Sequence, residues 1–437
     1  MDSARMQRPG AFREGRGARR RCPAASGRRP ARPIRGHAIR DLVIPGLVIL
    51  AASGACSDQA DPGAPWVVED SAGVTVVTTP ASHLETLPRW TLGSKPALDL
   101  GTVTGGGVTE FYDVADVRLI PGDRLVVANR GSEELRFFSL EGEHLHTAGR
   151  PGNGPREFKG LAMVRSRADS LVTYDSGNDR FSVRGPWGEY GRSFRLEWFS
   201  GLLVPEDVAG GLRILAITGR HMTELAGSGL LVDTALVSFY DMEGKLLDSV
   251  ARLPHNVRFV SRSGDWQTTL GAPLVAWAAL TATREGFCHA FGPEVEVRCF
   301  DARGGLRLIG RVAVPPRAVT DGDKDAYWER MRTLSSPERW SRFRSLRDQL
   351  PFPSAHSAFD ALQEDDQGVI WARRYQPPES GPEEWWLFRE GRLVAGVQAP
   401  ERFRLTHVQG GRVAGVWRDD LGVEHVRVYA LIRDAVG

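Results

Sequence analysis

The fold class is decided by residues 149–196, which read GRPGNGPREFKGLAMVRSRADSLVTYDSGNDRFSVRGPWGEYGRSFRL. The stretch opens with a loop rich in Gly and Pro and continues with three short apolar runs, 161–164, 170–174 and 180–183, separated by polar breaks. Short runs joined by tight turns are typical of an antiparallel meander of strands. We therefore interpret this stretch as one blade of a β-propeller.

A hairpin signal of the same kind recurs along the chain, in which an aromatic or apolar strand end meets a short polar turn that closes on glycine. The copies are Phe138–Gly142, Arg184–Gly188, Tyr240–Gly244, Phe300–Gly304 and Phe388–Gly391. Residues 404–408, 412–417 and 423–431 supply a sixth sheet. This recurrence predicts an all-β, six-bladed β-propeller of four-stranded antiparallel blades over residues 66–433. Several separate β-sandwiches are the alternative, but they need linkers that the sequence lacks.

Two further segments complete this prediction. Residues 66–79 read WVVEDSAGVTVVTT, and we expect residues 74–78 to be an N-terminal strand that completes the last blade and closes the ring. Residues 321–350 change the hydrophobic period from two to nearer 3.6, which predicts a helical insertion between blades. We expect Asp321 or Asp323 to cap the first helix, and Ser336 before Pro337 to cap the second.

The blade of residues 149–196 resembles an NHL repeat, because it carries GNGPREF at 152–158, YDSGNDR at 174–180 and a turn glycine at Gly188. The helical insertion, the strand of residues 365–371 and the terminal GVEHVRVY of residues 422–429 resemble a group of bacterial six-bladed β-propeller lipoproteins. The resemblance implies a propeller fold and a location in the cell envelope. It implies no particular activity.

The first 55 residues predict a signal segment. Residues 1–41 contain twelve Arg and three acidic residues, and residues 42–52 read LVIPGLVILAA. This apolar run is too short to span a bilayer and suits a signal-peptide core. Cys56 follows small residues, so we expect it to be lipidated, with residues 56–65 as a flexible tether. The alternative is a secreted chain in which Cys56 is a free thiol.

The charge of the chain disfavours nucleic acid as a partner. The leader of residues 1–41 carries a net charge of +9, whereas the whole chain carries +2, so −7 remains on residues 42–437. A negative body repels phosphate. We therefore expect no nucleic-acid binding, and we predict an exported monomer in the periplasm or at the cell surface, held to the membrane through its lipid anchor.

Several polar patterns are similar to functional motifs, but we favour a structural interpretation of each. Asp321, Asp323 and Asp325 start like a calcium loop, yet the later glycine and glutamate of that loop are missing, so we interpret them as helix-capping acids. The other patterns are the His144 and His146 pair, interpreted as exposed histidines, the turn at Glu364–Asp366, and Asp175 with Arg180, interpreted as a tie between strands.

Cys288 and Cys299 predict a disulfide. They flank a hairpin, and a turn centred on Pro293 and Glu294 places the two cysteines directly opposite each other. Such a bond is plausible in an oxidising envelope. Two buried thiols are the alternative.

Binding is the function that the sequence favours. We predict a ligand- or protein-binding module, or a scaffold, of the cell envelope, and its partner would be an envelope protein or a small ligand. The ligand would lie in the central channel, where the first strands of the blades supply Asp116, Arg118, Arg165 and His407. We identify no catalytic residue, metal site or cofactor. The alternative is a metal-dependent propeller hydrolase or lyase of the sugar-lactone type, whose site residues would leave no local motif.

Overall fold

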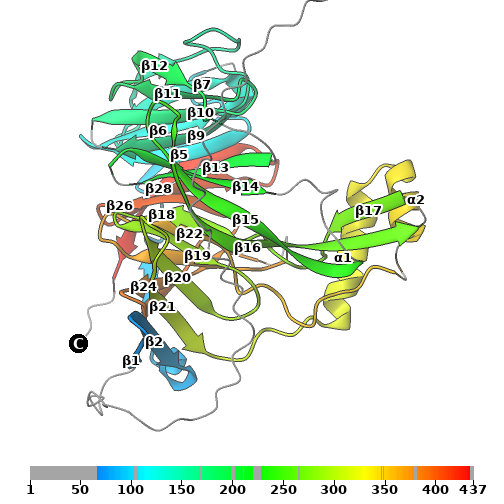
Figure 1. Cartoon of the computed structure of the whole chain (residues 1–437). Helices are drawn as coiled ribbons and strands as arrows, with labels where there is room; N and C mark the ends of the chain where they lie inside the picture. Colours follow the sequence, from blue (N-terminus) through cyan, green and yellow to red (C-terminus); the bar gives the residue numbers. More distant parts are fainter. Residues whose placement is uncertain are drawn as a thin grey trace, which may run out of the picture. The chain divides into compact units, whose positions relative to one another are not determined.

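The computed structural model describes residues 66–433 apart from 103–106, 168, 198–201, 210, 220–227, 264–265, 346, 348 and 378–380. The leader, Cys56 and the tether lie outside the described residues. The described part is built mainly from β-strands arranged in five hydrogen-bonded sheets (Figure 1). No helix in this part is long and apolar enough to cross a membrane.

Two of the sheets are four-stranded antiparallel meanders in which each strand pairs with the next along the chain. The first contains β5 (Val114–Ile120), β6 (Arg124–Asn129), β7 (Glu134–Ser139) and β8 (His144–Ala148), with a short 3₁₀ helix, η2 (Arg130–Ser132), before β7. The second contains β9 (Leu161–Arg167), β10 (Ser170–Asp175), β11 (Arg180–Arg184) and β12 (Tyr190–Phe194). The meander predicted for residues 149–196 is therefore confirmed.

The next two sheets also contain four consecutive antiparallel strands, but each has additional strands. One contains β13 (Leu202–Ala209), β14 (Arg213–Gly219), β15 (Gly229–Tyr240), β16 (Leu246–Ser263) and β17 (Trp266–Gly271). The other begins with β18 (Ala279–Ala282), β19 (Gly286–Ala290), β20 (Glu296–Asp301) and β21 (Leu306–Ala313). The first of these is longer than a four-stranded blade because β15 and β16 continue beyond their partners and pair with each other and with β17.

The fifth sheet joins two meanders. They are β22 (Phe359–Glu364), β23 (Ile370–Arg374), β24 (Glu384–Arg389) and β25 (Arg392–Gln398), followed by β26 (Phe403–Gln409), β27 (Arg412–Arg418) and β28 (Glu424–Ile432). The second meander matches the three strands predicted near the C-terminus. Consecutive four-stranded antiparallel sheets are the unit that β-propellers repeat around an axis.

Four turns share one hydrogen-bond pattern, and two of them are the predicted hairpins Tyr240–Gly244 and Phe300–Gly304. The Oδ1 atoms of Asp241, Asp301, Asp365 and Asp419 each accept the backbone N–H groups of residues two and four positions later. The glycine three positions after each Asp has a positive φ, which L side chains rarely adopt. The acidic run of residues 364–366 is therefore part of a turn, as the sequence predicted.

The prediction that residues 74–78 complete the last blade is wrong. Strand β1 (Val67–Ser71) pairs with β2 (Val74–Pro80), and β2 pairs in parallel with β21. After η1 (Ala81–Glu85), β3 (Arg89–Leu92) pairs with both β25 and β28, and β4 (Leu98–Leu100) pairs antiparallel with β28. The N-terminal strands beside β28 are thus β3 and β4, whereas β2 occupies the outer edge of β21.

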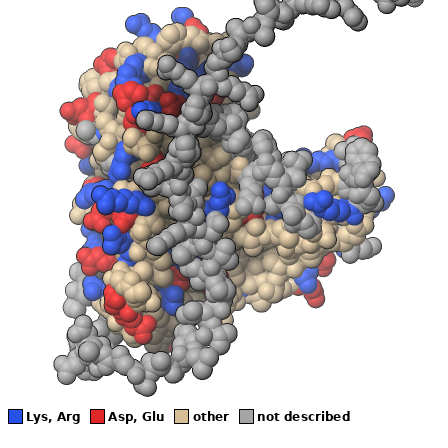
Figure 2. Space-filling model, viewed as in Figure 1, with Lys and Arg blue, Asp and Glu red and all other residues tan. Residues whose placement is uncertain are grey.

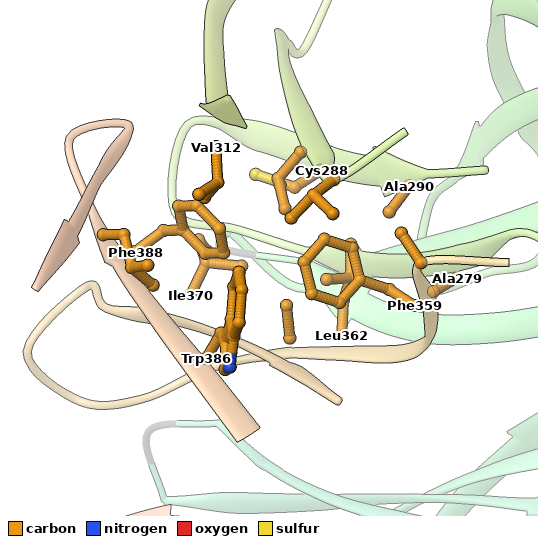
Figure 3. Close-up of a cluster of buried hydrophobic side chains, with 14 of the residues drawn as sticks. Ala279, Cys288, Ala290, Val312, Phe359, Leu362, Ile370, Trp386 and Phe388 are labelled. Atoms are coloured by element: carbon orange, nitrogen blue, oxygen red, sulfur yellow. The ribbon is translucent and has the colours of Figure 1, made fainter. Parts of the chain in front are cut away.

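The core lies between the faces of neighbouring sheets. Figure 3 shows one such cluster, in which Cys288 and Val312 from one sheet face Phe359, Trp386 and Phe388 from the next. All of these side chains are buried. Packing of this kind joins each meander to its neighbour through side chains rather than through strand pairing.

Cys288 and Cys299 form a disulfide within the hairpin of β19 and β20, with Cα atoms 4.1 Å apart. They are directly paired across the two strands. This is the register that the sequence predicted, and a slip by one residue would place the two side chains on opposite faces.

The helical insertion is present, and it packs against the long hairpin of β15 and β16 (Figure 1). It contains α1 (Asp321–Leu334) and α2 (Pro337–Ser345). Trp328 of α1 and Leu350 are buried against Phe259 of β16. The cap of α1 differs from the prediction: Thr320 is the N-cap, and Asp323 completes a capping box as the third helical residue. Ser336 accepts the N–H of Arg339 at the start of α2, as expected.

The position of β4 can be tested by mutation. Leu98 and Leu100 are both buried against β28 and its neighbours, so Leu98→Ala and Leu100→Ala should each lower the free energy of unfolding by about 2–5 kcal/mol. The control is Val67→Ala, because Val67 is exposed in β1 and should change stability by less than about 0.5 kcal/mol. Equal denaturant midpoints for all three variants would show that β4 is not a structural strand.

The disulfide can be tested by peptide mapping of the exported protein without reduction. We expect a crosslinked peptide that contains Cys288 and Cys299. Loss of the bond in Cys288→Ser should lower stability by up to about 3 kcal/mol, because the bond closes a short loop in the unfolded chain. Complete alkylation of both thiols in unreduced, denatured protein would contradict the pairing.

Candidate functional site

The first strands of successive meanders lie beside one another. Strand β5 lies beside β9, β13 beside β18, β18 beside β22, and β26 beside β5. The four residues predicted to bind a ligand belong to three of these strands, β5, β9 and β26. We therefore describe the polar side chains that these inner strands present to one another.

A β-bulge occurs at the same place in five inner strands. The extra, unpaired residues are Ala115 in β5, Ala162 in β9, Glu206 in β13, Asp360 in β22 and Thr406 in β26. A bulge bends a strand and redirects the side chains around it, and bulges are common beside active sites. Because the bulge recurs in these strands, the residues that directly follow it occupy equivalent positions in the different sheets.

The residue that follows the bulge links its strand to the next meander in three of these strands. Asp116 Oδ2 accepts the N–H of Val164 at 3.4 Å, and Asp207 Oδ2 accepts the N–H of Ala282 at 3.1 Å. His407 Nδ1 accepts the N–H of Leu119 at 3.0 Å. These three side chains are therefore equivalent, and each binds the backbone of a neighbouring inner strand.

Arg165 joins two of the equivalent positions. Its Nη1 lies 2.5 Å from Asp116 Oδ2, and its Nε lies 2.6 Å from Asp207 Oδ1. Arg118 adds a second guanidinium, whose Nε lies 3.1 Å from Asp116 Oδ1. The side chains of Arg118 and Arg165 are only 13% and 16% exposed. We call Asp116, Arg118, Arg165, Arg167, Glu206, Asp207 and His407 the central cluster.

The three arginines of the central cluster dominate its electrostatics. Burial alone would raise the pKa of Asp207, but the neighbouring guanidiniums, Arg165 first, hold it at about 2. Burial and then repulsion by Arg165 lower the pKa of Arg118 to about 10. The carboxylate of Asp207 is therefore fixed in its charged form beside crowded positive charges.

His407 is a neutral member of the cluster. Burial, followed by the positive charges of Arg118 and Arg165, lowers its pKa well below the ordinary value of 6.5. Because Nδ1 accepts the N–H of Leu119, the proton of the neutral ring is on Nε2. His407 can thus donate one hydrogen bond without adding charge.

Glu206 is the acidic residue of the cluster that titrates near neutrality. Burial, and then the charge of Asp207, raise its pKa to about 7, while Arg165 acts in the opposite direction. Glu206 makes no hydrogen bond or ion pair with the rest of the described chain. A partly exposed carboxyl with this pKa can hold or release a proton under physiological conditions.

The structure brings all four predicted residues into the central cluster, but it also shows residues that sequence analysis missed. Asp207 and Glu206 lie in β13, which was not aligned with the other first strands. A signal was present: Ala115-Asp116-Val117 and Glu206-Asp207-Val208 are equivalent, and each Asp also accepts the N–H of the Val that follows it. Arg167 lies two residues after Arg165 and was overlooked.

The other polar patterns have structural roles. Asp175 accepts hydrogen bonds from Arg180, Asn178 and the backbone of Lys159, so it ties a turn to the preceding loop. Asp321 pairs with Lys324 on the surface of α1. His146 is exposed, whereas His144 is partly buried and contacts Thr147. Within the described ranges, no three His, Cys, Asp or Glu side chains are grouped so that they could hold a metal ion.

A separate cleft of about 290 Å³ lies between two sheets. The disulfide lines one side of it, and Ile370 and Phe388 line the other. Glu364 and Arg284 are at its edge, where the backbone N–H of Arg284 donates to Glu364. This cleft does not include the four residues that the sequence predicted.

The visible surface carries acidic and basic side chains side by side (Figure 2). On this face they do not form a patch of one sign.

The chain is weakly similar to several solved structures, with TM-scores below 0.5. It is similar to an inferred exported protein of Bacteroides fragilis, with 9% identity and a TM-score of 0.44 over 79% of this chain and 99% of that one. A member of the DUF4221 family from Bacteroides vulgatus has 8% identity and a TM-score of 0.44 over 78% and 97%. Virginiamycin B lyase from Staphylococcus aureus has 8% identity and a TM-score of 0.36 over 77% and 99%. Likenesses this weak carry no information about a ligand or an activity.

No protein-family model and no curated protein sequence matches the chain.

The pKa of Glu206 predicts a pH dependence of stability. Its folded-state pKa of about 7 exceeds the model value of 4.5, so the folded state loses stability as the pH rises from about 4.5 through 7. Glu206→Gln should remove this loss. At pH 8 its free energy of unfolding should exceed that of the wild type by on the order of 1–3 kcal/mol. At pH 4 the two proteins should have similar stability. A difference that does not change with pH, measured by urea unfolding, would contradict the raised pKa.

Proposed function

We propose that the chain is an exported, lipid-anchored β-propeller whose six blades close into a ring and bind a ligand at the centre. The observation that carries this proposal is the central cluster, in which side chains from β5, β9, β13 and β26 meet as one network. In a propeller the first strands of the blades surround the axis. A ligand at that position would contact several blades at once.

Contacts between β26 and β5 support a closed ring. Arg404 Nη2 donates to the carbonyl of Val114 at 2.7 Å, and Thr406 donates to the carbonyl of Val117 at 2.9 Å. Together with the hydrogen bond from Leu119 to His407, they join the last inner strand to the first. Pairing of β4 with β28 would then give the last blade its fourth strand.

Binding is favoured over metal-dependent chemistry because of what the cluster contains. Its most crowded charges are guanidiniums, and the histidine accepts a backbone hydrogen bond through Nδ1. Cationic side chains repel a metal ion but hold polar or charged ligands. The partner would be a small ligand or a group on an envelope protein, and the chain would act as a monomer that does not bind nucleic acid.

The envelope location rests on the leader and on Cys56. Lipidation of Cys56 would leave a ten-residue tether, residues 56–65, before β1, so the body would remain close to the membrane.

Cell fractionation of a Cys56→Ser variant tests the anchor. We expect the wild type in the membrane fraction and the variant in the soluble exported fraction, because the acyl chains would be lost. Equal membrane association of the two proteins, or an intact leader on the mature chain, would contradict the anchor without affecting the central site.

Binding at the centre can be tested with His407→Asn, which keeps a hydrogen-bond acceptor near the position of Nδ1 but lacks the Nε2 donor. We expect a panel of sugars, amines and organic acids to contain a compound that raises the melting temperature of the wild type. The shift should be reduced in His407→Asn and retained in Arg303→Gln, an exposed turn variant. Compounds that shift all three proteins equally would contradict a central site.

A further inference from the structure

While Glu206 is protonated, the central cluster contains more positive than negative charge. Arg118, Arg165 and Arg167 supply three guanidiniums, whereas Asp116 and Asp207 supply the two carboxylates that pair with them. Arg167 forms no salt bridge with a described residue. Its Nε and Nη1 donate to the backbone carbonyls of Val208 and Ser166, and it attracts Asp207 and Glu364 without direct contact. A largely enclosed group of charges is stable only when it is nearly neutral, so an excess guanidinium favours a counter-ion.

The guanidinium groups of this cluster are held in place, but some of their N–H groups have no hydrogen-bond acceptor among the described residues. Arg165 is fixed by two carboxylates, and Arg118 is fixed through Nε by Asp116. The Nη atoms of Arg118 and the Nη2 atom of Arg167 have no hydrogen-bond partner within the described part of the chain. Guanidinium groups held in this way bind carboxylate, sulfate or phosphate oxygens through charge-assisted hydrogen bonds.

The lowered pKa of His407 reflects burial first and then the combined charge of the three guanidiniums. Arg118, Arg165 and Arg167 each act to keep His407 uncharged, and only Asp207 opposes them among the principal influences. The three guanidiniums therefore act together on the ring of His407, which is held beside β5 by the N–H of Leu119. The protonated Nε2 of this ring is a neutral donor at the same place.

We propose that the central cluster is an anion-binding site, in which Arg118, Arg165 and Arg167 hold a carboxylate, sulfate or phosphate group. This rests on the proposed function, since it names the class of ligand for the central site. His407 donates from Nε2 to the bound oxygen. Glu206 stands beside the site and opposes the anion when it is ionised.

Several titratable groups face this site, and they decide its pH dependence. Asp116 and Arg118 come from β5, Arg165 and Arg167 from β9, Glu206 and Asp207 from β13, Glu364 from β22, and His407 from β26. Asp207 stays ionised and His407 stays neutral between pH 6 and 8. Glu206 changes its charge in this range, so the anion should bind more tightly at pH 6 than at pH 8.

The test is calorimetric titration of the purified exported protein with sulfate at constant ionic strength. Sulfate is chosen because its own charge does not change between pH 6 and 8. We expect saturable binding that is at least about tenfold weaker in Arg167→Gln, which loses a charge-assisted donor. This variant leaves Asp116 and Asp207 paired with Arg165 and should still fold. Arg303→Gln removes the same charge from an exposed turn and should bind like the wild type.

The pH dependence is tested with two matched variants. Sulfate affinity should rise severalfold from pH 8 to pH 6 in the wild type and in Glu141→Gln, which changes an exposed turn, and should be constant in Glu206→Gln. Glucuronate compared with sulfate tells an anionic group on a larger ligand from a free anion, because tighter binding of glucuronate would indicate the larger ligand. Glucose, which lacks the carboxylate, should not bind.

Equal sulfate affinity of the wild type and Arg167→Gln, or no saturable binding of sulfate or glucuronate, would overturn the anion site. If a neutral or cationic compound binds and His407→Asn weakens it, the proposed central site stands and only the ligand class is wrong. If compounds bind without any effect of the central variants, the proposed function fails as well.

Discussion

The structure depends on one shared arginine. Arg165 of β9 contacts Asp116 of β5 and Asp207 of β13, so a single guanidinium joins the inner strands of three successive sheets. Removing one partner of such a largely buried network costs about 3–5 kcal/mol, because the remaining charge is left without compensation. The same contacts hold the guanidinium in one orientation. The interaction that orders the inner strands is therefore also the one that prepares the centre for a ligand.

The repeated bulge explains how a regular fold acquires an irregular site. Each of five inner strands carries one unpaired residue, and the residue after it is Asp in β5 and β13 but His in β26. These three residues perform the same structural task, since each accepts an N–H group from a neighbouring strand. Their chemistry differs, however, so equivalent positions give a charged acceptor in two places and a neutral donor in the third.

The sequence predicted the meanders, the turns and the helical insertion, because alternating apolar residues and Asp-x-x-Gly turns are local signals. It could not assign the edge on which an N-terminal strand pairs: residues 74–80 are strongly β-forming, yet they lie on β21, while the short β4 pairs with β28. Asp116, Arg118, Arg165 and His407 were predicted from aligned first strands. Asp207 was missed because β13 was not aligned, and the pairing of Arg165 with two aspartates depends on contacts between distant parts of the chain.

The central claim is that the inner strands of a closed propeller form a site with excess positive charge. Crystals of the exported protein soaked in selenate test it most directly, because selenium gives an anomalous signal that locates each bound anion. The account predicts a selenate whose oxygens lie within hydrogen-bond distance of Arg118 and Arg167, inside a ring closed between β26 and β5. Selenate found only at exposed surface arginines, or an open edge between β26 and β5, would contradict it.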